Sequence, residues 1–392
     1  MVLVLTEEQE LLKRSAREFV NATFAVNQVR QFRDQAAEND TFRLRYSRKH
    51  WQQMAELGWT GIIFPEQYGG LGLGYAELGV VLEELGRSLA AQPFLSTVLL
   101  AGNTLLLGGN EDQKQEWLPG ICTGEKTLAL AFQESGRFSP WQVNTRAETT
   151  TDGFKISGEK RFVLDGYGAD QLVVLARTSG STGDRDGLSL FLVDPDAPDI
   201  SISDVQLLDS RNAALIEFDG TEVSAQQLVG ELGKAAEILE PVFDCAIAGL
   251  NAELVGIMSE AFERTLEYLK TRQQFGALIG TFQALKHRAA DMFCEREHAL
   301  SMTMAALRAL DDKNNDKSDG KSDDTSLLIS AAKARTSDAA NLIGRESIQM
   351  FGGIGMTDEE DIGLFMKRAR VAEITLGDSN FHRQRFADLS GF

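Results

Sequence analysis

The spacing of hydrophobic residues changes twice along the chain, and this constrains the fold more than any other feature of the sequence. Up to Gly120 apolar residues recur at helical spacing, as in the stretch 75–89. Alternation with a period of two then predicts strands over 128–132, 154–158, 171–176, 189–193 and 214–218. After Gly230 helical spacing returns. The order predicts an α+β fold with an N-terminal helical domain (1–125), a middle β-sandwich or barrel (126–229) and a C-terminal helical domain (230–392).

Local signals divide the helical parts further. Residues 6–60 are predicted to be helical, and Thr6 with Gln9 has the spacing of a capping box at their start. A glycine-rich loop follows at 65–74, and Pro119 with Gly120 is predicted to end the next helical stretch. The polar, charged segment 311–326 is predicted to be a mobile loop between two long helices.

Composition excludes several classes of function. The 392 residues carry a net charge of −19, which argues against binding nucleic acid or an anionic membrane through a basic surface. Three scattered cysteines, at 122, 245 and 294, lack metal-site spacing and are predicted to be buried thiols in a reducing cytosol. The first residues do not resemble a signal peptide, and no apolar run approaches the roughly 18 residues of a membrane helix. We therefore expect a cytoplasmic protein without a metal ion.

Two segments of the C-terminal half carry the chemical signal. The stretch 347–356 (SIQMFGGIGM) places three glycines in a helical pattern, where each costs about 1 kcal/mol relative to alanine. Such glycines indicate a bend or a close approach of the backbone to another group. About 75 residues upstream lie Arg272-Gln-Gln-Phe-Gly and Phe282-Gln-Ala-Leu-Lys-His-Arg.

In this order and spacing, the two segments resemble the flavin-dependent acyl-CoA dehydrogenase family. The resemblance covers the whole chain and implies a C-terminal four-helix bundle and an oxidoreductase acting on CH–CH bonds in lipid metabolism. It also implies FAD bound between two subunits, so that this chain contacts its neighbour's cofactor. Arg272 would pair with the diphosphate, since a guanidinium offers several donors in one plane. The other implied cofactor-binding residues are Phe275, Phe282, Gln283, Gln349, Phe351, Gly352 and Gly353.

The β-domain segments that hold the flavin in this family are altered here. The family sequence Thr-Glu-Pro-Gly-Ala-Gly-Ser-Asp corresponds to the stretch Gln133 to Ser139 (QESGRFS). The family sequence Trp-Ile-Thr-Asn-Gly corresponds to Phe162-Val-Leu164-Asp-Gly, and Leu164 lacks the hydroxyl that bonds the flavin. Backbone contacts to FAD remain possible at Gln133, Ser139, Phe162 and Leu164.

The catalytic base of the family is absent from its usual position. The resemblance implies a glutamate that removes the α-proton, but the matching residue is Leu376. The alternative position, on the first helix of the bundle, is Ala246. Asp244 and Asp378 are the nearest carboxylates and are candidate bases. Phe243 with Asp244 also matches a Phe-Asp pair that contacts CoA in the family.

Three functions remain open from the sequence. The chain could be one subunit of a hetero-oligomeric acyl-CoA dehydrogenase whose partner supplies the base, as in bacterial enzymes that act on steroid side-chain CoA thioesters. It could be a self-sufficient homo-oligomer, dimer or tetramer, with a relocated aspartate base. It could also be a non-catalytic scaffold that binds acyl-CoA or FAD. Electron-transfer flavoprotein, or a similar acceptor, is the expected redox partner of an active enzyme.

Overall fold

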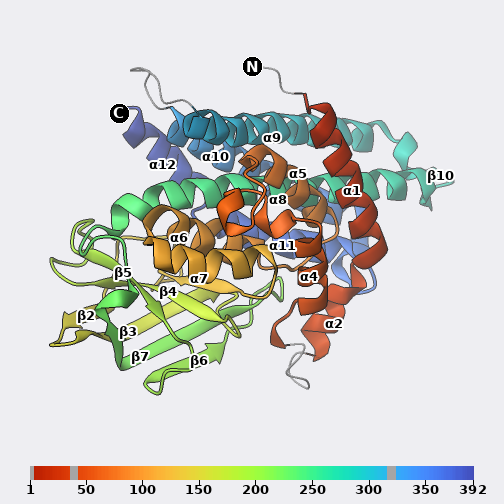
Figure 1. The fold of residues 1–392 in the computed structure, drawn as a ribbon. Helices are drawn as coiled ribbons and strands as arrows, with labels where there is room; N and C mark the ends of the chain where they lie inside the picture. The colour runs from red at the N-terminus through yellow and green to blue at the C-terminus, as the bar shows by residue number, and fades with distance from the viewer. Residues whose placement is uncertain (1–3, 36–42, 316–323) are drawn as a thin grey trace. The chain divides into compact units, whose positions relative to one another are not determined.

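The computed structural model describes residues 4–35, 43–315 and 324–392 (Figure 1). By their internal contacts these residues form two compact units. Unit 1 consists of residues 1–30, 74–90 and 247–392, and unit 2 of residues 31–73 and 91–246. The units follow packing, whereas the predicted domains follow sequence order. The domain boundaries at 125 and 229 therefore stay a prediction.

Unit 2 is built on one eight-stranded sheet (Figure 1). The strand order is β6-β7-β3-β2-β4-β5-β8, and β1 pairs in parallel with β4. The strands are β1 (Leu128–Ala131), β2 (Arg146–Thr149), β3 (Gly153–Leu164), β4 (Gln171–Arg177), β5 (Leu188–Val193), β6 (Ile200–Asp204), β7 (Ala213–Ser224) and β8 (Leu228–Val229). All five predicted strands are present, which confirms the β unit. β2 and β6 were missed because they are only four and five residues long and mostly exposed, so any apolar alternation in them is short.

The core of the sheet lies on its central strands. Every residue of β4 and β5 is buried, as expected for strands covered on both faces. β3 and β7 are longer and alternate between buried and exposed residues. Phe154 of β3 and Phe191 of β5 pack in this core with ring centroids 5.0 Å apart.

The helical segments of unit 2, together with the first helix of unit 1, correct two predictions. The helix predicted over 6–60 is divided into α1 (Glu7–Thr23), α2 (Asn27–Gln35) and α4 (Arg48–Glu56), and residues 36–42 lie outside the described structure. α7 (Glu111–Cys122) continues past Pro119 instead of ending there. The remaining helical elements are η1 (Trp59–Gly61), η2 (Glu66–Tyr68), η3 (Phe94–Gly102), α6 (Asn103–Gly108) and η4 (Ala225–Gln227).

Unit 1 is helical apart from one small hairpin. The predicted capping box at its first helix is present, because Thr6 and Gln9 exchange hydrogen bonds of 3.1 and 3.2 Å. Besides α1, its elements are α5 (Tyr75–Arg87), the later part of α8 (Ala235–Thr271), β9 (Gln273–Gln274), β10 (Ala277–Leu278), η5 (Ile279–Thr281), α9 (Gln283–Asn315), α10 (Thr325–Phe351), η6 (Gly352–Met356), α11 (Ile362–Ile374) and α12 (Ser379–Leu389).

Helices α5 and α8 cross with their backbones almost in contact. A Cβ atom on Gly86 would lie 2.2 Å from the carbonyl oxygen of Glu253, and one on Gly256 would lie 1.9 Å from that of Glu83. Only glycine permits such an approach. Next to this crossing the buried side chains of Arg368 and Glu253 form a bidentate ion pair at 2.9 and 2.8 Å.

Part of the loop predicted over 311–326 is helical, and Asp311 within it contacts α5. Residues 311–315 continue α9, Thr325 and Ser326 begin α10, and 316–323 lie outside the described residues. The Asp311 carboxylate accepts hydrogen bonds from the backbone N–H groups of Tyr75 (2.6 Å) and Ala76 (3.0 Å). It thereby caps α5, whose first turn would otherwise carry unpaired donors.

One helix passes a simple test for membrane spanning. By length and composition alone α8 contains a window apolar enough to cross a bilayer, contrary to the sequence-based expectation. That window is entirely buried within the structure, as expected for a central bundle helix, so the evidence for a span is weak. The cysteines also differ from expectation in part, since Cys122 and Cys245 are buried but Cys294 is exposed.

Candidate functional site

The ends of α8 and α10 meet in an aromatic stack within unit 1. The rings of Tyr268 and Phe351 lie 4.3 Å apart at an interplanar angle of 16°, and the Tyr268 hydroxyl donates to the Phe351 carbonyl oxygen at 3.3 Å. Arg272 lies one turn beyond Tyr268, and its N–H donates to the Tyr268 carbonyl oxygen at 2.9 Å. The arginine segment and the glycine segment singled out in the sequence are therefore structurally joined.

A tight hairpin follows Arg272 and projects an aromatic side chain. β9 and β10 pair with only Phe275 and Gly276 between them, and both have positive φ (53° and 75°). Such a turn matches the twist of a two-residue hairpin. The Phe275 side chain is 93% exposed, and its ring lies 6.3 Å from that of Phe282, at the start of α9. Gln283 is exposed at the same end of the helix.

The Arg272 side chain and the backbone at Gly352 and Gly353 are exposed and could bind a ligand. Among the described residues, the exposed Arg272 guanidinium has no hydrogen-bonded or ionic partner, so the alternative that it merely pairs with a carboxylate of this unit is not seen. Gly352 has φ +69°, and a Cβ at Gly352 or Gly353 would meet no atom within 4 Å. An exposed cation and accessible glycine backbone in the same unit fit a polyanionic, planar cofactor such as FAD. The exposed Gln349 adds an amide on the last turn of α10.

The altered loop of the β unit is held by a buried ion pair. The Glu134 carboxylate accepts from the Asn144 N–H (2.6 Å), the Thr145 N–H (3.0 Å) and the buried Lys160 ammonium (2.6 Å). Burial raises the pKa of Glu134, but Lys160 and the Asn144 N–H outweigh it, so the pKa lies below its ordinary value. Burial lowers the pKa of Lys160 to about 8. The loop 133–139 is thus held through Glu134 by residues of the same unit.

Four aromatic rings close over this loop. Phe138 packs edge-on against Phe132 (6.1 Å) and Phe243 (5.5 Å), and Phe132 and Phe243 lie 5.0 Å apart. Trp141 adds a fourth ring, 6.0 Å from Phe243. Phe243, the predicted CoA contact, is therefore only 4% exposed, and the adjacent Asp244 only 5%.

The second altered segment lies on a bulge of β3. The pairing of β3 with β7 shifts register between Lys160 and Val163, and Phe162 in the gap has φ +53° and a 38% exposed side chain. Leu164 is half-buried at the end of β3. The next residue, Asp165, accepts from the Ser96 hydroxyl at 2.5 Å. An irregular strand end of this kind exposes backbone groups, as the predicted contacts to a flavin require.

Leu376, at the position where the resemblance predicts a base, lies in a strained and well-anchored turn of unit 1. Leu376 is 2% exposed and has φ +58°, a rare conformation for a residue other than glycine. Its carbonyl oxygen lies 2.9 Å from Nε2 of the buried His382. The buried Lys333 ammonium donates to the Ala372 carbonyl oxygen at 2.6 Å, near the end of α11. Asp378 caps α12, accepting from the Phe381 N–H at 2.9 Å.

Burial sets the protonation of the groups behind this turn. It lowers the pKa of Lys333 to about 7, although Glu373 opposes the shift. Burial, together with the Lys333 charge, lowers the pKa of His382 to about 3, so the imidazole is neutral near pH 7 and Nε2–H donates to Leu376.

The structure groups the predicted residues by unit. Unit 1 carries Arg272, Phe275, Phe282, Gln283, Gln349, Phe351, Gly352, Gly353, Leu376 and Asp378, and unit 2 carries Gln133, Ser139, Phe162, Leu164, Phe243 and Asp244. Their roles remain predictions. Sequence reasoning missed Tyr268, for which the only signal was its position one helical turn before Arg272. Within the described ranges, no three His, Cys, Asp or Glu residues are grouped to hold a metal ion.

Comparison with known proteins gives three adjoining family matches. They are the acyl-CoA dehydrogenase N-terminal domain at residues 6–125, the middle domain at 129–221 and the C-terminal domain at 245–389. Mitochondrial isovaleryl-CoA dehydrogenase from Bos taurus is 30% identical over 97% of this chain and 87% of its own length.

Solved structures show the same likeness in three dimensions. Butyryl-CoA dehydrogenase from Megasphaera elsdenii aligns over 100% of both chains with a TM-score of 0.86 and 25% identity. A chain described as "Tcur3481-Tcur3483 steroid ACAD" aligns over 98% of both chains with a TM-score of 0.83 and 29% identity. These relatives are FAD-dependent oxidoreductases of CH–CH bonds. The chain belongs to the acyl-CoA dehydrogenase family.

Proposed function

We propose that this chain is one subunit of a hetero-oligomeric, FAD-dependent acyl-CoA dehydrogenase whose partner chain supplies the catalytic base. The observation that carries the proposal is Leu376, a buried residue that cannot accept a proton, at the position where the family places its glutamate. The chemistry that FAD supplies, when bound, is acceptance of a hydride from the acyl chain. The α-proton must pass to a carboxylate, and the partner provides one.

Neither candidate aspartate of this chain is a good substitute. Asp378 is exposed and accepts a backbone hydrogen bond as the cap of α12. A base must reach the α-carbon of a bound thioester, and a carboxylate engaged as a helix cap would have to give up that bond first. Asp244 is 5% exposed, beside the aromatic cluster that buries Phe243. The homo-oligomer with a relocated base is therefore the weaker alternative.

The residues that would serve a neighbouring subunit are available for binding. Arg272, Gln349, Gly352 and Gly353 are exposed on unit 1, and Arg272 has no partner among the described residues. In the proposed complex Arg272 neutralises the diphosphate of FAD bound mainly by the partner. Gln283 and Gln349 donate to polar atoms of the cofactor, and Phe275, Phe282 and Phe351 pack beside it.

The loop 133–139, which corresponds to the flavin-holding loop of the family, also supports the proposal that the partner binds most of the FAD. Phe138 and Arg137 replace the small residues of the family loop, and Phe138 is engaged with Phe132 and Phe243. The likeness to a structure described as a steroid acyl-CoA dehydrogenase complex favours a bulky CoA thioester as substrate. Electron-transfer flavoprotein, or a similar acceptor, would reoxidise the cofactor.

The test is the flavin content of the chain alone and with partners. The purified chain and its co-expressed complexes with acyl-CoA dehydrogenase chains that retain the glutamate are compared by flavin absorbance per protein and by dye-coupled oxidation of acyl-CoA. We expect a colourless lone chain and an active, flavin-containing complex. A lone chain that holds one FAD and oxidises an acyl-CoA would overturn the proposal.

A matched pair of variants tests which residues act in the complex. Arg272→Met should lower the flavin content of the complex without preventing assembly. Arg14→Met removes an exposed arginine of α1 instead and should leave the flavin content unchanged. Equal flavin retention in both variants would exclude the proposed role of Arg272.

A further inference from the structure

Unit 1 contains an apolar hollow of about 270 Å³ that the proposed function does not use. It lies among the start of α1, α5, α8 and α9, and between bundle helices is a usual place for ligand sites. Its apolar lining consists of Val4, Leu5, Ala76, Gly79, Val80, Ala252, Val255, Leu300, Met304 and Leu307. None of the residues predicted to bind FAD or CoA takes part in it.

Small side chains leave this hollow open. Ala76 and Gly79 on α5 and Ala252 on α8 all line it. At Gly79 the approach of α9 is already close, because a Cβ there would lie 2.4 Å from Cδ1 of Leu307. Leu307 thus packs directly against α5 at Gly79, while the small side chains at Ala76 and Ala252 leave space in the hollow.

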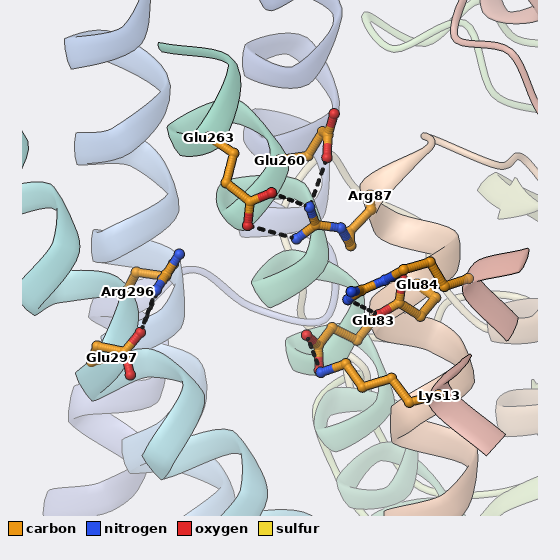
Figure 2. A network of polar contacts seen from close by, with 9 residues as sticks. Lys13, Glu83, Glu84, Arg87, Glu260, Glu263, Arg296 and Glu297 are labelled. Carbon is orange, nitrogen blue, oxygen red and sulfur yellow. Dashed lines mark hydrogen bonds and ion pairs between the residues drawn. The ribbon is translucent and has the colours of Figure 1, made fainter. Parts of the chain in front are cut away.

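Polar contacts at its edge hold the surrounding helices in place. Lys13 of α1 pairs with Glu83 of α5 at 2.9 Å, as Figure 2 shows, and Gln9 donates to Glu77 at 2.8 Å. Asp311 of α9 holds the start of α5. Because these contacts resist collapse, the lining atoms lack neighbours that a bound molecule would supply.

The charges at the rim favour an uncharged ligand. Lys13 and Arg308 are balanced by Glu10 and Glu83, so the rim carries no net charge. Lys13 is already paired with Glu83, and Arg308 donates to the Val4 carbonyl oxygen at 2.6 Å. In the wall, the Thr303 hydroxyl is paired with that of Thr336 at 3.3 Å. A charged ligand would lose hydration in a mostly apolar hollow whose rim carries no net charge to compensate for it.

We propose that this hollow binds an uncharged aliphatic chain of medium length. Its volume lies just below the range of about 300–1,000 Å³ typical of small-molecule sites, so the ligand is short. Binding would also hold Val4 and Leu5 against the bundle, because both line the hollow. The inference is independent of the proposed dehydrogenase function, since it rests on none of the same residues.

The experiment uses 1-octanol as the probe and octanoate as its charged counterpart. Titration calorimetry and thermal unfolding are measured on the full chain. We expect saturable binding of one octanol per chain with a raised Tm, and binding of octanoate at least about tenfold weaker, the cost of an unpaired charge. Equal affinity for the two probes, or unsaturable uptake of octanol, would overturn the proposal.

Cavity-filling variants locate the site. Ala252→Leu and Ala76→Leu each place a larger side chain in the hollow, and each should abolish saturable octanol binding. Ala305→Leu is the matched control, because Ala305 lies on α9 next to Met304 but does not line the hollow. Far-UV circular dichroism verifies folding of each variant, and two filling variants guard against one that fails to fold. Unchanged octanol affinity in a folded filling variant would place the ligand elsewhere and reject the proposal.

Discussion

Tyr268 stacks almost parallel on Phe351, with ring centroids 4.3 Å apart, and its hydroxyl donates to the Phe351 carbonyl oxygen. This contact fixes the end of α8, which carries Arg272, to the end of α10, which leads into Gly352. The predicted diphosphate cation and the exposed glycine backbone thus share one support. The Tyr268–Phe351 stack could position Arg272 and Gly352 without either ring touching the cofactor.

We predict that Tyr268→Ala weakens flavin retention by the active complex about tenfold, because an aromatic pair contributes about 0.5–1.5 kcal/mol beyond its buried area. The free-FAD dependence of activity measures the effect. Tyr268→Phe is the control, since it keeps the ring and loses only the 3.3 Å hydrogen bond. If Tyr268→Ala binds flavin as well as Tyr268→Phe, the stack does not position Arg272.

Gly256→Ala should destabilise the chain strongly. The new Cβ would lie 1.9 Å from the Glu83 carbonyl oxygen, so α5 and α8 must separate, at a cost of about 1–3 kcal/mol or more. Urea unfolding of the lone chain measures it. Gly353→Ala, where a Cβ meets no atom within 4 Å, should unfold like the wild type. Similar unfolding midpoints for the two variants would contradict the close helix crossing.

Leu376→Glu should not restore catalysis to the lone chain. Its carboxylate would occupy a site only 2% exposed, and burying it should cost about 3 kcal/mol of stability at neutral pH. Leu376→Met conserves volume and should cost less than about 1.5 kcal/mol. Acyl-CoA oxidation is assayed for both variants as isolated chains. Turnover by Leu376→Glu alone would show that the chain's own flavin site is intact and would refute the need for a partner.

The contribution of the two buried lysines to stability should rise between about pH 7 and pH 10.5. Burial lowers the pKa of Lys333 to about 7 and that of Lys160 to about 8, whereas in the unfolded chain both titrate near their ordinary values. Over this interval the unfolded chain binds more protons, so raising the pH disfavours unfolding. His382 acts at lower pH, because its lowered pKa makes stability fall below about pH 6.5.

Lys333→Met tests whether the lowered pKa of Lys333 contributes to the pH dependence of stability. The variant should unfold with a smaller difference between about pH 7.5 and pH 9.5 than the wild type. Urea unfolding at both pH values measures that difference. Lys286→Met, at an exposed position of α9, should keep the wild-type dependence. A slope in Lys333→Met equal to that of the wild type would show that Lys333 titrates normally.

The sequence predicted the elements that have strong periodicity and missed those defined by contacts. β4 and β5 were visible because every residue in them is buried and most are apolar. The break in the helix predicted over 6–60 was not visible, because α1, α2 and α4 have similar composition. The helical turn at Asp311 depends on a partner 236 residues away, the Tyr75 N–H, which no local pattern reveals.

In the candidate site, too, the sequence indicated residues in local motifs but not residues that act through tertiary contacts. Arg272 and the glycines at 352–353 could be predicted as site residues because the resemblance covers contiguous segments. Tyr268 and Lys333 were not, since each acts through a tertiary contact: a ring stack in one case and a carbonyl in the other. Nor could the sequence indicate that Phe138 would engage Phe243, because these residues lie on separate elements.

The turn around Leu376 is anchored through its backbone, by His382 at the Leu376 carbonyl and by Lys333 at the Ala372 carbonyl. These two contacts hold the turn through backbone carbonyl oxygens and do not involve the side chain at position 376. After a gene duplication, one copy could exchange an acid for an aliphatic residue here and still fold and assemble with its sibling. Specialisation of two chains from one ancestral enzyme would then begin with a change of chemistry and leave the architecture intact.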